Sequence, residues 1–284
     1  MNFNLFGEEI TEANNLKQMF LIEPYSVINT RDHKWQRLKK MWKDILKENG
    51  ETREEEAFSK RRNTGIQKRN NEIPTEKQKQ FMYNDKNISL FDPVISQLCY
   101  EWFCVKGGYV IDCCAGDTMK GNVIAKLGGV FTGIELRKEQ VEHNNIKAFY
   151  GAKWVCDTGE NIINHININS ADMILSCPPY FNLEVYSELE NDISNSKSYD
   201  LFIKSLEKMY AESIKCLKND SFACIVIQNI RKVKSQLYID YYPFKEDVIK
   251  IFTNNGMAFY NDIVILKANG TAQMRAIPYM NQKK

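Results

Sequence analysis

Short apolar runs recur at regular intervals along the central part of the chain, and they constrain its fold more than any other feature. They cover residues 109–112, 130–135, 152–156, 173–177 and 222–227. The stretches between them show helical spacing, so strand and helix patterns alternate. This alternation predicts an α/β fold of the Rossmann-like type, with a mostly parallel sheet and helices on both faces.

The helical patterns and the flanks complete this expectation. A helix begins at Pro93, because proline suits the first helical turn. The other predicted helices span residues 121–127, 138–149, 199–217 and 240–255, and a last strand or strand pair spans 259–266. Residues 231–242 and 182–198 are expected to be loops.

Polar groups stand where four of the predicted strands end. Asp112, Glu135 and Asp157 each close an apolar run, and a fourth run leads into residues 176–181, Ser-Cys-Pro-Pro-Tyr-Phe. In parallel sheets a ligand binds beyond the carboxyl ends of the strands, at the point where the strand order reverses. The four groups are therefore expected on one rim.

The turn that follows Asp112 consists mainly of small residues. It lacks the GxGxxG pattern and a P-loop lysine, which argues against a dinucleotide and against ATP. An acid at its start suits a ligand with an ammonium group, such as S-adenosylmethionine. Glu135 would then hold the ribose, and Asp157 the adenine amino group. A plain role as strand-end caps is the alternative for these acids.

The Pro178-Pro179 pair makes the fourth strand end unusual. Two prolines fix φ and offer carbonyl oxygens without N–H donors, and Tyr180 adds an aromatic face. This combination suits an amino group on a flat ring. The alternative is an ordinary turn in which Tyr180 and Phe181 are core aromatics.

Basic residues are concentrated near the N-terminus. Residues 34–69 hold twelve basic and six acidic residues, whereas the formal charge of the whole chain is +2. The sequence predicts an arm over residues 1–88, with an amphipathic helix at 33–47 and a long loop at 48–87, followed by a catalytic domain over residues 89–284. Such an arm favours a polyanionic partner.

The eight cysteines are scattered and mostly lie in apolar runs. This pattern indicates a reduced protein of the cytoplasm. No cysteine pair or nearby histidine has the spacing of a metal site, and no apolar stretch reaches the roughly 18 residues of a membrane span, so neither metal nor membrane is expected.

Three motifs in this order resemble those of amino-group DNA methyltransferases, and most closely the phage and mobile-element type. They are Asp-Cys-Cys-Ala-Gly-Asp at 112–117, Gly-Ile-Glu-Leu-Arg at 133–137, and Ser-Cys-Pro-Pro-Tyr-Phe-Asn at 176–182. The resemblance extends to Phe91-Asp92-Pro93 and to Gly270-Thr271-Ala272 with Arg275. It implies a class I methyltransferase fold, S-adenosylmethionine as methyl donor and a flipped base in double-stranded DNA as acceptor.

The resemblance also assigns residues. Cys177, Pro178, Pro179 and Tyr180 would be catalytic. The cofactor would contact Phe91, Asp92, Asp112, Cys113, Ala115, Gly116, Asp117, Glu135, Leu136, Asp157 and Thr158. DNA would contact Phe181, Asn182, Arg61, Arg62, Arg231, Lys232 and Arg275. A homodimer and a bacterial or phage-infected host cytoplasm are further expectations.

Cys177 departs from the family pattern, which has Asp, Asn or Ser before the two prolines. A thiol is a weak acceptor, and the usual guide to adenine N6 or cytosine N4 is lost. The target base is therefore left open. The alternatives are an RNA or protein amino-methyltransferase and a DNA-binding relative without catalysis.

Overall fold

The computed structural model describes residues 27–46, 91–181, 187, 189–235 and 238–266. Contacts divide the chain into two compact units. One unit consists of residues 1–47 and 259–284, and the other of residues 48–258. The boundary expected at residue 88 differs from this division, because the segment after residue 258 belongs with the N-terminal segment.

The larger unit contains a five-stranded parallel sheet with the order β4-β3-β2-β5-β6. Its strands are β2 (Tyr109–Asp112), β3 (Val130–Glu135), β4 (Ala152–Cys156), β5 (Ala171–Ser176) and β6 (Leu217–Ile225). Numbered along the chain, this is the order 3-2-1-4-5 of a Rossmann-like fold, and it reverses between β2 and β5. The predicted fold class is confirmed.

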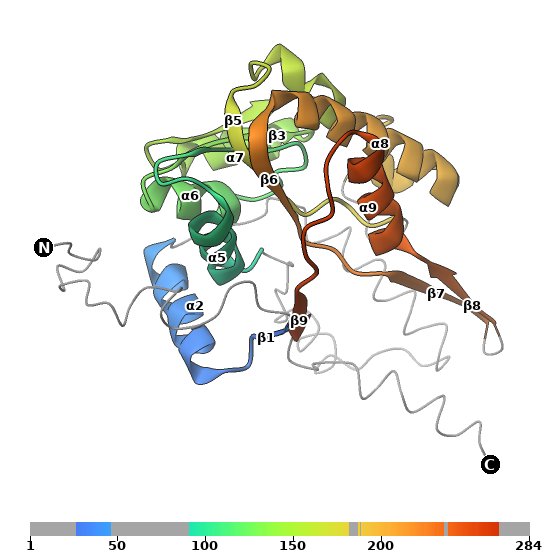
Figure 1. The fold of residues 1–284 in the computed structure, drawn as a ribbon, viewed down its shortest axis with the longest axis horizontal. Helices are drawn as coiled ribbons and strands as arrows, with labels where there is room; N and C mark the ends of the chain where they lie inside the picture. Colours follow the sequence, from blue (N-terminus) through green and yellow to red (C-terminus); the bar gives the residue numbers. More distant parts are fainter. Residues whose placement is uncertain (1–26, 47–90, 182–186, 188, 236–237, 267–284) are drawn as a thin grey trace, which may run out of the picture. The chain divides into compact units, whose positions relative to one another are not determined.

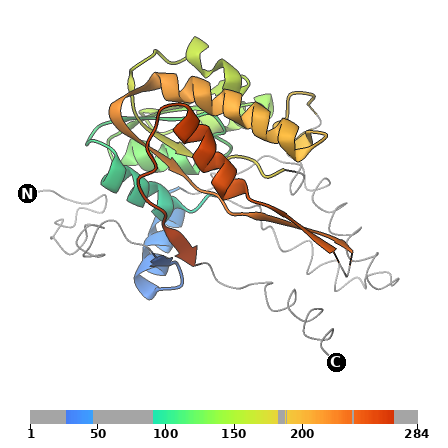
Figure 2. The same ribbon diagram turned by 45° about the vertical axis from the view of Figure 1, so that its right-hand side comes forward.

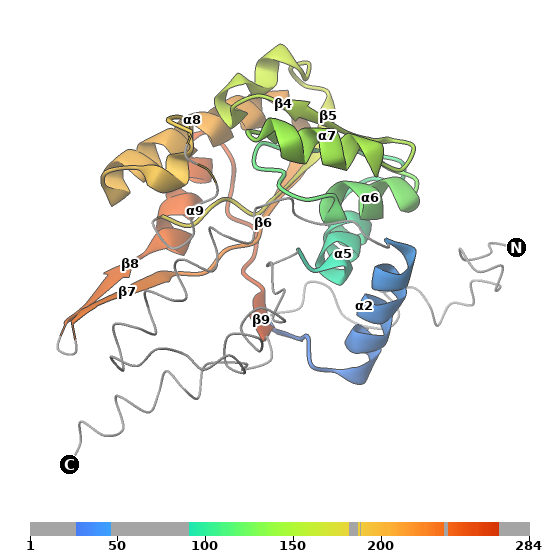
Figure 3. The ribbon, with the colours of Figure 1, turned by 180° about the vertical axis from the view of Figure 1, so that it is seen from behind.

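Helices cover both faces of this sheet. They are α5 (Pro93–Phe103), α6 (Met119–Lys126), α7 (Lys138–Ile146), α8 (Tyr199–Cys216) and α9 (Phe244–Asn254), with short 3-10 helices η2 (Gly159–Asn164) and η3 (Ile193–Asn195). Helices α8 and α9 lie side by side (Figure 1). Helices α6 and α7 lie towards the viewer when the molecule is seen from behind (Figure 3).

Residue alternation along β3 explains the two layers. Ile134 belongs to the apolar cluster that includes Phe202 and Leu206 of α8. Phe131, three residues earlier, lies on the opposite face, where a Cβ on Gly121 of α6 would come within 2.5 Å of its ring. Because successive strand residues point to opposite faces, the core of α8 and α9 lies on one side of the sheet and α6 on the other.

Residues 230–242 form a hairpin rather than the expected loop. Strands β7 (Ile230–Ser235) and β8 (Tyr238–Tyr242) pair antiparallel and separately from the main sheet (Figure 2). The helix expected from residue 240 therefore begins only at Phe244, after Pro243. The aromatic and β-branched run at 238–242 favours a strand, which outweighed the helical spacing.

The boundaries of the other elements differ less from those predicted from the sequence. Strand β6 begins at Leu217, directly after α8, instead of at residue 222, and it is irregular, with Asp220 at φ 59°. Helix α6 begins two residues earlier than expected, at Met119, and α7 ends at Ile146. Strand β5 ends at Ser176, so Cys177 is the first residue beyond the sheet.

The smaller unit joins distant parts of the sequence. Strand β1 (Val27–Asn29) pairs in parallel with β9 (Val264–Leu266), and the Thr30 hydroxyl donates to the Leu266 carbonyl at 2.7 Å. Helix α2 (His33–Ile45) starts where the Asp32 carboxylate accepts from the Lys34 N–H. The predicted amphipathic helix is thus confirmed, with Trp35 and Trp42 buried at helical spacing.

Candidate active site

The carboxylate of Asp112 lies at the end of β2 and is fully buried. One oxygen accepts from the Cys114 N–H at 2.9 Å, and the other lies 2.6 Å from the ammonium group of Lys120, which is 3% exposed. The acid was expected to face an ammonium group of a ligand. The structure instead provides that cation from the chain itself, so the pair is neutral as a unit.

Lys120 stands in the first turn of α6 and brings its ammonium group to the end of β2. Its Nζ lies 3.4 Å from the Cys114 carbonyl oxygen and 5.1 Å from the centre of the Phe91 ring. Burial alone would lower the pKa of Lys120, but the charges of Asp112 and Cys177 outweigh burial and raise it. Lys120 therefore remains a cation at neutral pH.

The turn between β2 and α6 rests directly on β3. Ala115 donates its N–H to the Ile134 carbonyl at 2.9 Å. A Cβ on Gly133 would come within 2.4 Å of the Ala115 Cβ, and Gly116 has a φ of +60°, which glycine adopts without strain. Small residues are thus required at this turn, in which Gly116 remains partly exposed.

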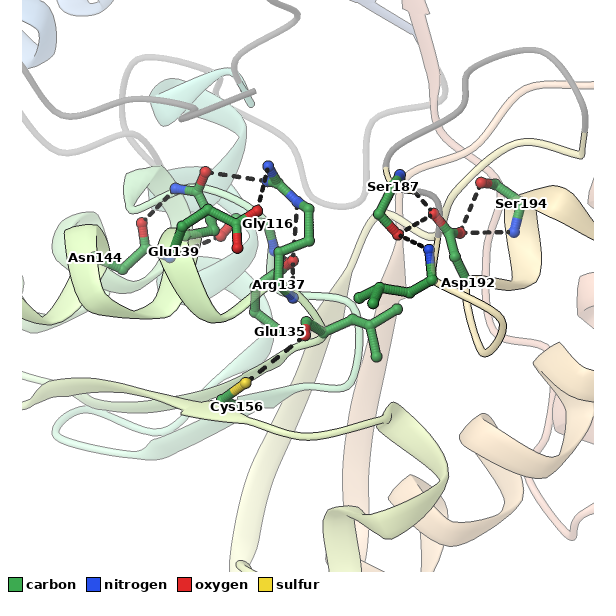
Figure 4. A network of polar contacts seen from close by, with 12 residues as sticks. Gly116, Glu135, Arg137, Glu139, Asn144, Cys156, Ser187, Asp192 and Ser194 are labelled. Carbon is green, nitrogen blue, oxygen red and sulfur yellow. Dashed lines mark hydrogen bonds and ion pairs between the residues drawn. The ribbon is translucent and has the colours of Figure 1, made fainter. Parts of the chain in front are cut away.

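Glu135 holds the turn from the end of β3 (Figure 4). Its Oε2 accepts from the Gly116 N–H and its Oε1 from the Arg137 N–H, both at 3.0 Å. Oε1 also lies 3.4 Å from the Arg137 Nε, so Arg137 contacts this oxygen through both its backbone and its guanidinium group. The Glu135 side chain is 11% exposed, which suits a contact with a pair of hydroxyls.

Side chains of α7 close this network into a ring. Arg137 donates to Gln140 at 3.0 Å, Gln140 donates to Asn144 at 2.7 Å, and Asn144 donates to the Gly116 carbonyl at 2.7 Å. Gln140 and Asn144 are fully buried. The turn is therefore fixed through both the N–H and the C=O of Gly116 before any ligand binds.

Asp117 connects the turn to the segment before α5. Its two oxygens accept from the Met119 N–H at 2.8 Å and from the Phe91 N–H at 3.3 Å. Asp92 caps α5 by accepting from the Val94 N–H at 3.0 Å. These contacts bring Phe91 to the turn, while Asp92 has a helix-capping contact of its own.

Asp157 is the acid at the end of β4. It accepts from the Thr158 N–H at 2.7 Å and from Asn161 at 2.8 Å, and its other oxygen lies 2.7 Å from His165 Nε2. Burial raises its pKa, but these hydrogen bonds, with that of His165 the largest, outweigh burial and lower it. Much of the acceptor capacity of Asp157 is therefore used within its own turn.

The two proline residues stand directly after β5, next to the β2 turn in the sheet order. Pro178 is buried, whereas Cys177, Pro179 and Tyr180 are partly exposed. The Tyr180 ring meets Phe244 of α9 edge to face, with 5.7 Å between centroids. The Tyr180 ring is thus supported by α9.

Phe181 was expected to contact DNA, and the structure places it in the core. It is 7% exposed and packs against Tyr199, Phe202 and Tyr242 at 5.6–5.8 Å between ring centroids. The alternative given for Phe181, that it is an aromatic residue of the core, is therefore the one that the structure supports. This cluster also fixes the end of β8 beside the turn at 177–180.

Two short contacts complete the surroundings of the rim. The Tyr210 hydroxyl of α8 donates to the Ser176 hydroxyl at 3.2 Å, and burial raises the pKa of Tyr210. The sulfur atoms of Cys113 and Cys114 lie 3.9 Å apart, and the hydrogen bond with Cys113 raises the pKa of Cys114. Both groups are therefore neutral at physiological pH.

The loop after the proline turn has its own scaffold. Asp192 is buried and accepts from the N–H and the hydroxyl of both Ser187 and Ser194, at 2.6–3.0 Å (Figure 4). The described part of this loop is thus built around an internal carboxylate.

The remaining predicted contacts fall in several places. Cys113 and Ala115 are buried in the turn, and Leu136 accepts through its carbonyl from Cys156. Arg231 and Lys232 lie on β7, opposite Tyr241 and Asp240 of β8. Arg61, Arg62, Asn182 and Arg275 lie outside the described residues.

Sequence reasoning missed Lys120 and Asn144, which the structure places at the rim. The signal for Lys120 was a lysine within the apolar start of a helix, eight positions after a strand-end acid. The signal for Asn144 was its four-residue spacing from Gln140, which puts both amides on one helix face.

Among the residues that the structure describes, no group of three or more His, Cys, Asp or Glu side chains could hold a metal ion. Within the same ranges, no helix is long and apolar enough to cross a bilayer.

Neither a protein-family model nor a curated protein sequence matches the chain. Solved structures with a related chain path include a TehB-like S-adenosylmethionine-dependent methyltransferase from Corynebacterium glutamicum, with 14% identity and a TM-score of 0.39 over 65% of this chain and 82% of that chain. NSun6 from Pyrococcus horikoshii, with SFG, has 16% identity and a TM-score of 0.43 over 63% of this chain and 45% of that chain. PH0851 has 14% identity and a TM-score of 0.37 over 45% of this chain and 30% of that chain.

The chain therefore spans less than half the length of two of these three proteins. Similarity this weak carries no argument about what the chain binds, and its chemistry has to be inferred from its own residues.

Proposed function

We propose that the chain transfers a methyl group from S-adenosylmethionine to the exocyclic amine of a base in DNA. The observation that carries this proposal is the placement of the Pro178-Pro179-Tyr180 turn. The turn follows β5, and the neighbouring strand β2 leads into the glycine turn at 113–117. The two motifs thus flank the point where the strand order reverses, which is where such folds bind ligands.

The residues at the rim fit S-adenosylmethionine. Glu135 would accept hydrogen bonds from the ribose hydroxyls, and the turn at Gly116 would let the ligand approach the backbone. The methyl donor, when bound, supplies an electrophilic carbon on a sulfonium sulfur. Phe91, Leu136 and Thr158 would line the cofactor, and Asp112 would act by holding Lys120 and the Cys114 N–H in place.

An exocyclic amine is a poor nucleophile, because its lone pair is delocalised into the ring. Acceptors placed on its hydrogens draw the nitrogen towards a tetrahedral geometry and free that lone pair. The carbonyl oxygen of Pro178 and the side chain of Cys177 would be these acceptors, and Tyr180 would stack on the flipped base. This is why the proposal assigns catalysis to residues 177–180.

The basic segments support DNA as the partner. Helix α2 has five basic residues and one acidic residue, and Lys34, Arg37, Lys40 and Lys43 are exposed. The β7 sequence Ile-Arg-Lys-Val-Lys-Ser adds three more basic residues. Such residues contact phosphates and give an affinity that depends on salt.

Mass spectrometry of nucleosides tests the proposal. DNA from cells that express the chain is compared with DNA from cells that express the Tyr180→Ala variant. The proposal predicts N6-methyladenine or N4-methylcytosine above the variant background, and the modified base identifies the target. The absence of both bases, with the protein folded and present, would contradict it.

Two other functions are tested in parallel. Tritium transfer from labelled S-adenosylmethionine to duplex DNA, RNA and protein separates a DNA enzyme from an RNA or protein methyltransferase. Calorimetry with unlabelled cofactor tests the third function: absence of cofactor binding would contradict an enzyme, and binding without turnover on any acceptor would favour a DNA-binding relative without catalysis.

A further inference from the structure

The β7–β8 hairpin begins at the same edge of the sheet as the proline turn. Strand β6 ends at Ile225, which pairs with Ser176, the last residue of β5. The Val226 N–H then donates to the Ser176 carbonyl at 2.9 Å, and β7 begins at Ile230. The hairpin and the turn at 177–180 therefore leave the sheet at the same level.

The far end of the hairpin also contacts the proline turn. Tyr242, the last residue of β8, packs edge to face against Phe181, with 5.6 Å between ring centroids, and stacks on Tyr199 at 4.5 Å. Phe244, the first residue of α9, packs against Tyr180 at 5.7 Å. Strand β8 thus passes directly into the residues that support the Tyr180 ring.

Tyr241 precedes Tyr242 on β8 and has the opposite environment. Because successive strand residues point to opposite faces, its side chain points away from the aromatic cluster, and it is 52% exposed. The Tyr241 hydroxyl accepts from the side-chain amide of Asn229, whose oxygen accepts from the Lys245 N–H at 2.7 Å. An exposed aromatic ring is therefore tied by Asn229 to the start of α9.

The hairpin that carries Tyr241 suits a nucleic-acid duplex. The β7 sequence holds Arg231, Lys232 and Lys234, and Arg231 stands opposite Tyr241 in the ladder. The two strands extend away from α8 and α9 (Figures 1 and 2). A two-stranded β-ribbon fits the major groove, basic residues favour phosphates, and an aromatic ring stacks on any base that has lost its neighbour.

We propose that Tyr241 stacks in the gap that the target base leaves in the DNA duplex, while Tyr180 holds the base itself. The inference rests on the proposed function, because a base is flipped out only for chemistry on its ring. Extrusion breaks the stacking of that base with both of its neighbours, and an inserted ring restores part of this contact. Asn229 is a positioning residue, since it holds the Tyr241 hydroxyl.

Binding to two DNA duplexes tests the stacking contact without methyl transfer. One duplex is intact, and the other has the same sequence with one abasic site, which presents the gap of a flipped base. Fluorescence anisotropy gives the ratio of the two dissociation constants, and the wild type should bind the abasic duplex more tightly. Tyr241→Ala should reduce this ratio at least about fivefold, the effect of losing one stacking contact. An equal ratio in the wild type and in Tyr241→Ala would overturn the proposal.

Matched variants separate stacking from folding, because loss of folded protein affects both duplexes equally. Tyr241→Phe keeps the ring and should keep most of the ratio. Tyr150→Ala removes a fully exposed tyrosine just before β4 and should leave the ratio unchanged. Asn229→Ala should lower the ratio, and Asn229→Asp should restore it, because a carboxylate can accept from both the Tyr241 hydroxyl and the Lys245 N–H. A full ratio in Asn229→Ala would refute the role of Asn229.

Photochemical cross-linking locates the contact. Irradiation joins 5-iodouracil to an aromatic ring that stacks on it, so this base is placed beside the abasic site. Mass spectrometry of the tryptic peptide 235–245 should find the adduct on Tyr241. An adduct only on other residues would contradict the assignment, and an equal preference for an abasic RNA duplex would contradict DNA as the partner.

The same experiments separate this inference from the proposed function. A ratio that falls in Tyr241→Ala, without methylation of any acceptor by the wild type, would support the stacking contact and refute the proposed function. Methylation of DNA with a ratio that does not depend on Tyr241 would refute the inference and leave the proposed function in place.

Discussion

Asn144 of α7 donates to the carbonyl oxygen of Gly116 at 2.7 Å, and the Glu135 carboxylate of β3 accepts from the Gly116 N–H at 3.0 Å. The glycine turn is therefore held at both of its polar backbone atoms by side chains from two different elements. This arrangement fixes the turn independently of any ligand.

Asn144→Leu should weaken cofactor binding without contact to the cofactor. The substitution has a similar volume but removes the hydrogen bonds that Asn144 makes with the Gly116 carbonyl and with the amide nitrogen of Gln140, which costs about 1–3 kcal/mol. Calorimetry should show a tenfold or larger loss of affinity for S-adenosylmethionine, because tenfold corresponds to about 1.4 kcal/mol, within that range. The neighbouring Asn145, which bonds to the backbone of Trp154, provides the control, since Asn145→Leu should lower stability more than affinity.

Gly133→Ala should destabilise the fold, because the new Cβ would lie 2.4 Å from the Ala115 Cβ. Overpacking of this kind costs about 1–3 kcal/mol. Urea unfolding measures the change. The compensating double variant Gly133→Ala/Ala115→Gly removes the clash at Ala115 and should recover part of the loss, and failure to recover any of it would argue against this contact.

Tyr180→Ala should reduce turnover far more than cofactor affinity. Loss of a stacking partner costs about 1–3 kcal/mol per base, which is on the order of ten- to a hundredfold in rate if the ring stacks in the transition state. Tyr180→Phe keeps the ring against Phe244 and should retain most of the activity. Equal losses in kcat and in the affinity measured by calorimetry would contradict the assigned roles.

Asp157 should contribute stability that disappears in acid. Its folded pKa lies below the ordinary value because the hydrogen bonds of His165, Asn161 and the Thr158 N–H outweigh burial. A lowered folded pKa stabilises the protein above the unfolded value, about pH 3.9, and this contribution is lost as pH falls through the folded pKa. Urea unfolding of Asp157→Asn should therefore show a deficit at neutral pH that shrinks below about pH 4. The exposed Asp200→Asn is the control and should show no such convergence.

Lys40→Gln and Lys43→Gln should weaken DNA binding equally for all sequences. Both side chains are exposed on α2, so their loss should leave stability nearly unchanged. If each contacts one phosphate, the slope of log affinity against log salt should fall by about one per substitution. Gln36→Ala on the same helix removes no charge and should keep the slope. An unchanged slope in the double variant would exclude α2 from the DNA interface.

The sequence was sufficient for the features that depend on residue pattern. Apolar runs that end in Asp112, Glu135 and Asp157 predicted the parallel strands, and their common rim followed from the topology of such sheets. The proline turn could be placed at the same rim because it follows a buried strand. The strands, the acids at their ends and the proline turn could be predicted because each depends on residues that are neighbours in the sequence.

Features that depend on contacts with residues of other elements could not be predicted from the sequence pattern. The pairing of Asp112 with Lys120 requires the path of the turn between them, and the strand identity of residues 238–242 depends on the pairing with β7. Phe181 illustrates the same limit, because its burial is decided by Tyr199 and Tyr242, which arrive from later elements.

The parallel pairing of β1 with β9 has a consequence for how the chain reaches its native state. The Thr30 hydroxyl and its acceptor, the Leu266 carbonyl, are 236 positions apart in the sequence. During synthesis, β1 leaves the ribosome long before β9 exists, so this ladder forms after the central sheet has had time to fold. Contacts of such high sequence separation form late and slowly. The smaller unit should therefore gain protection from hydrogen exchange last in a refolding experiment, and nascent chains that end before residue 264 should lack it altogether.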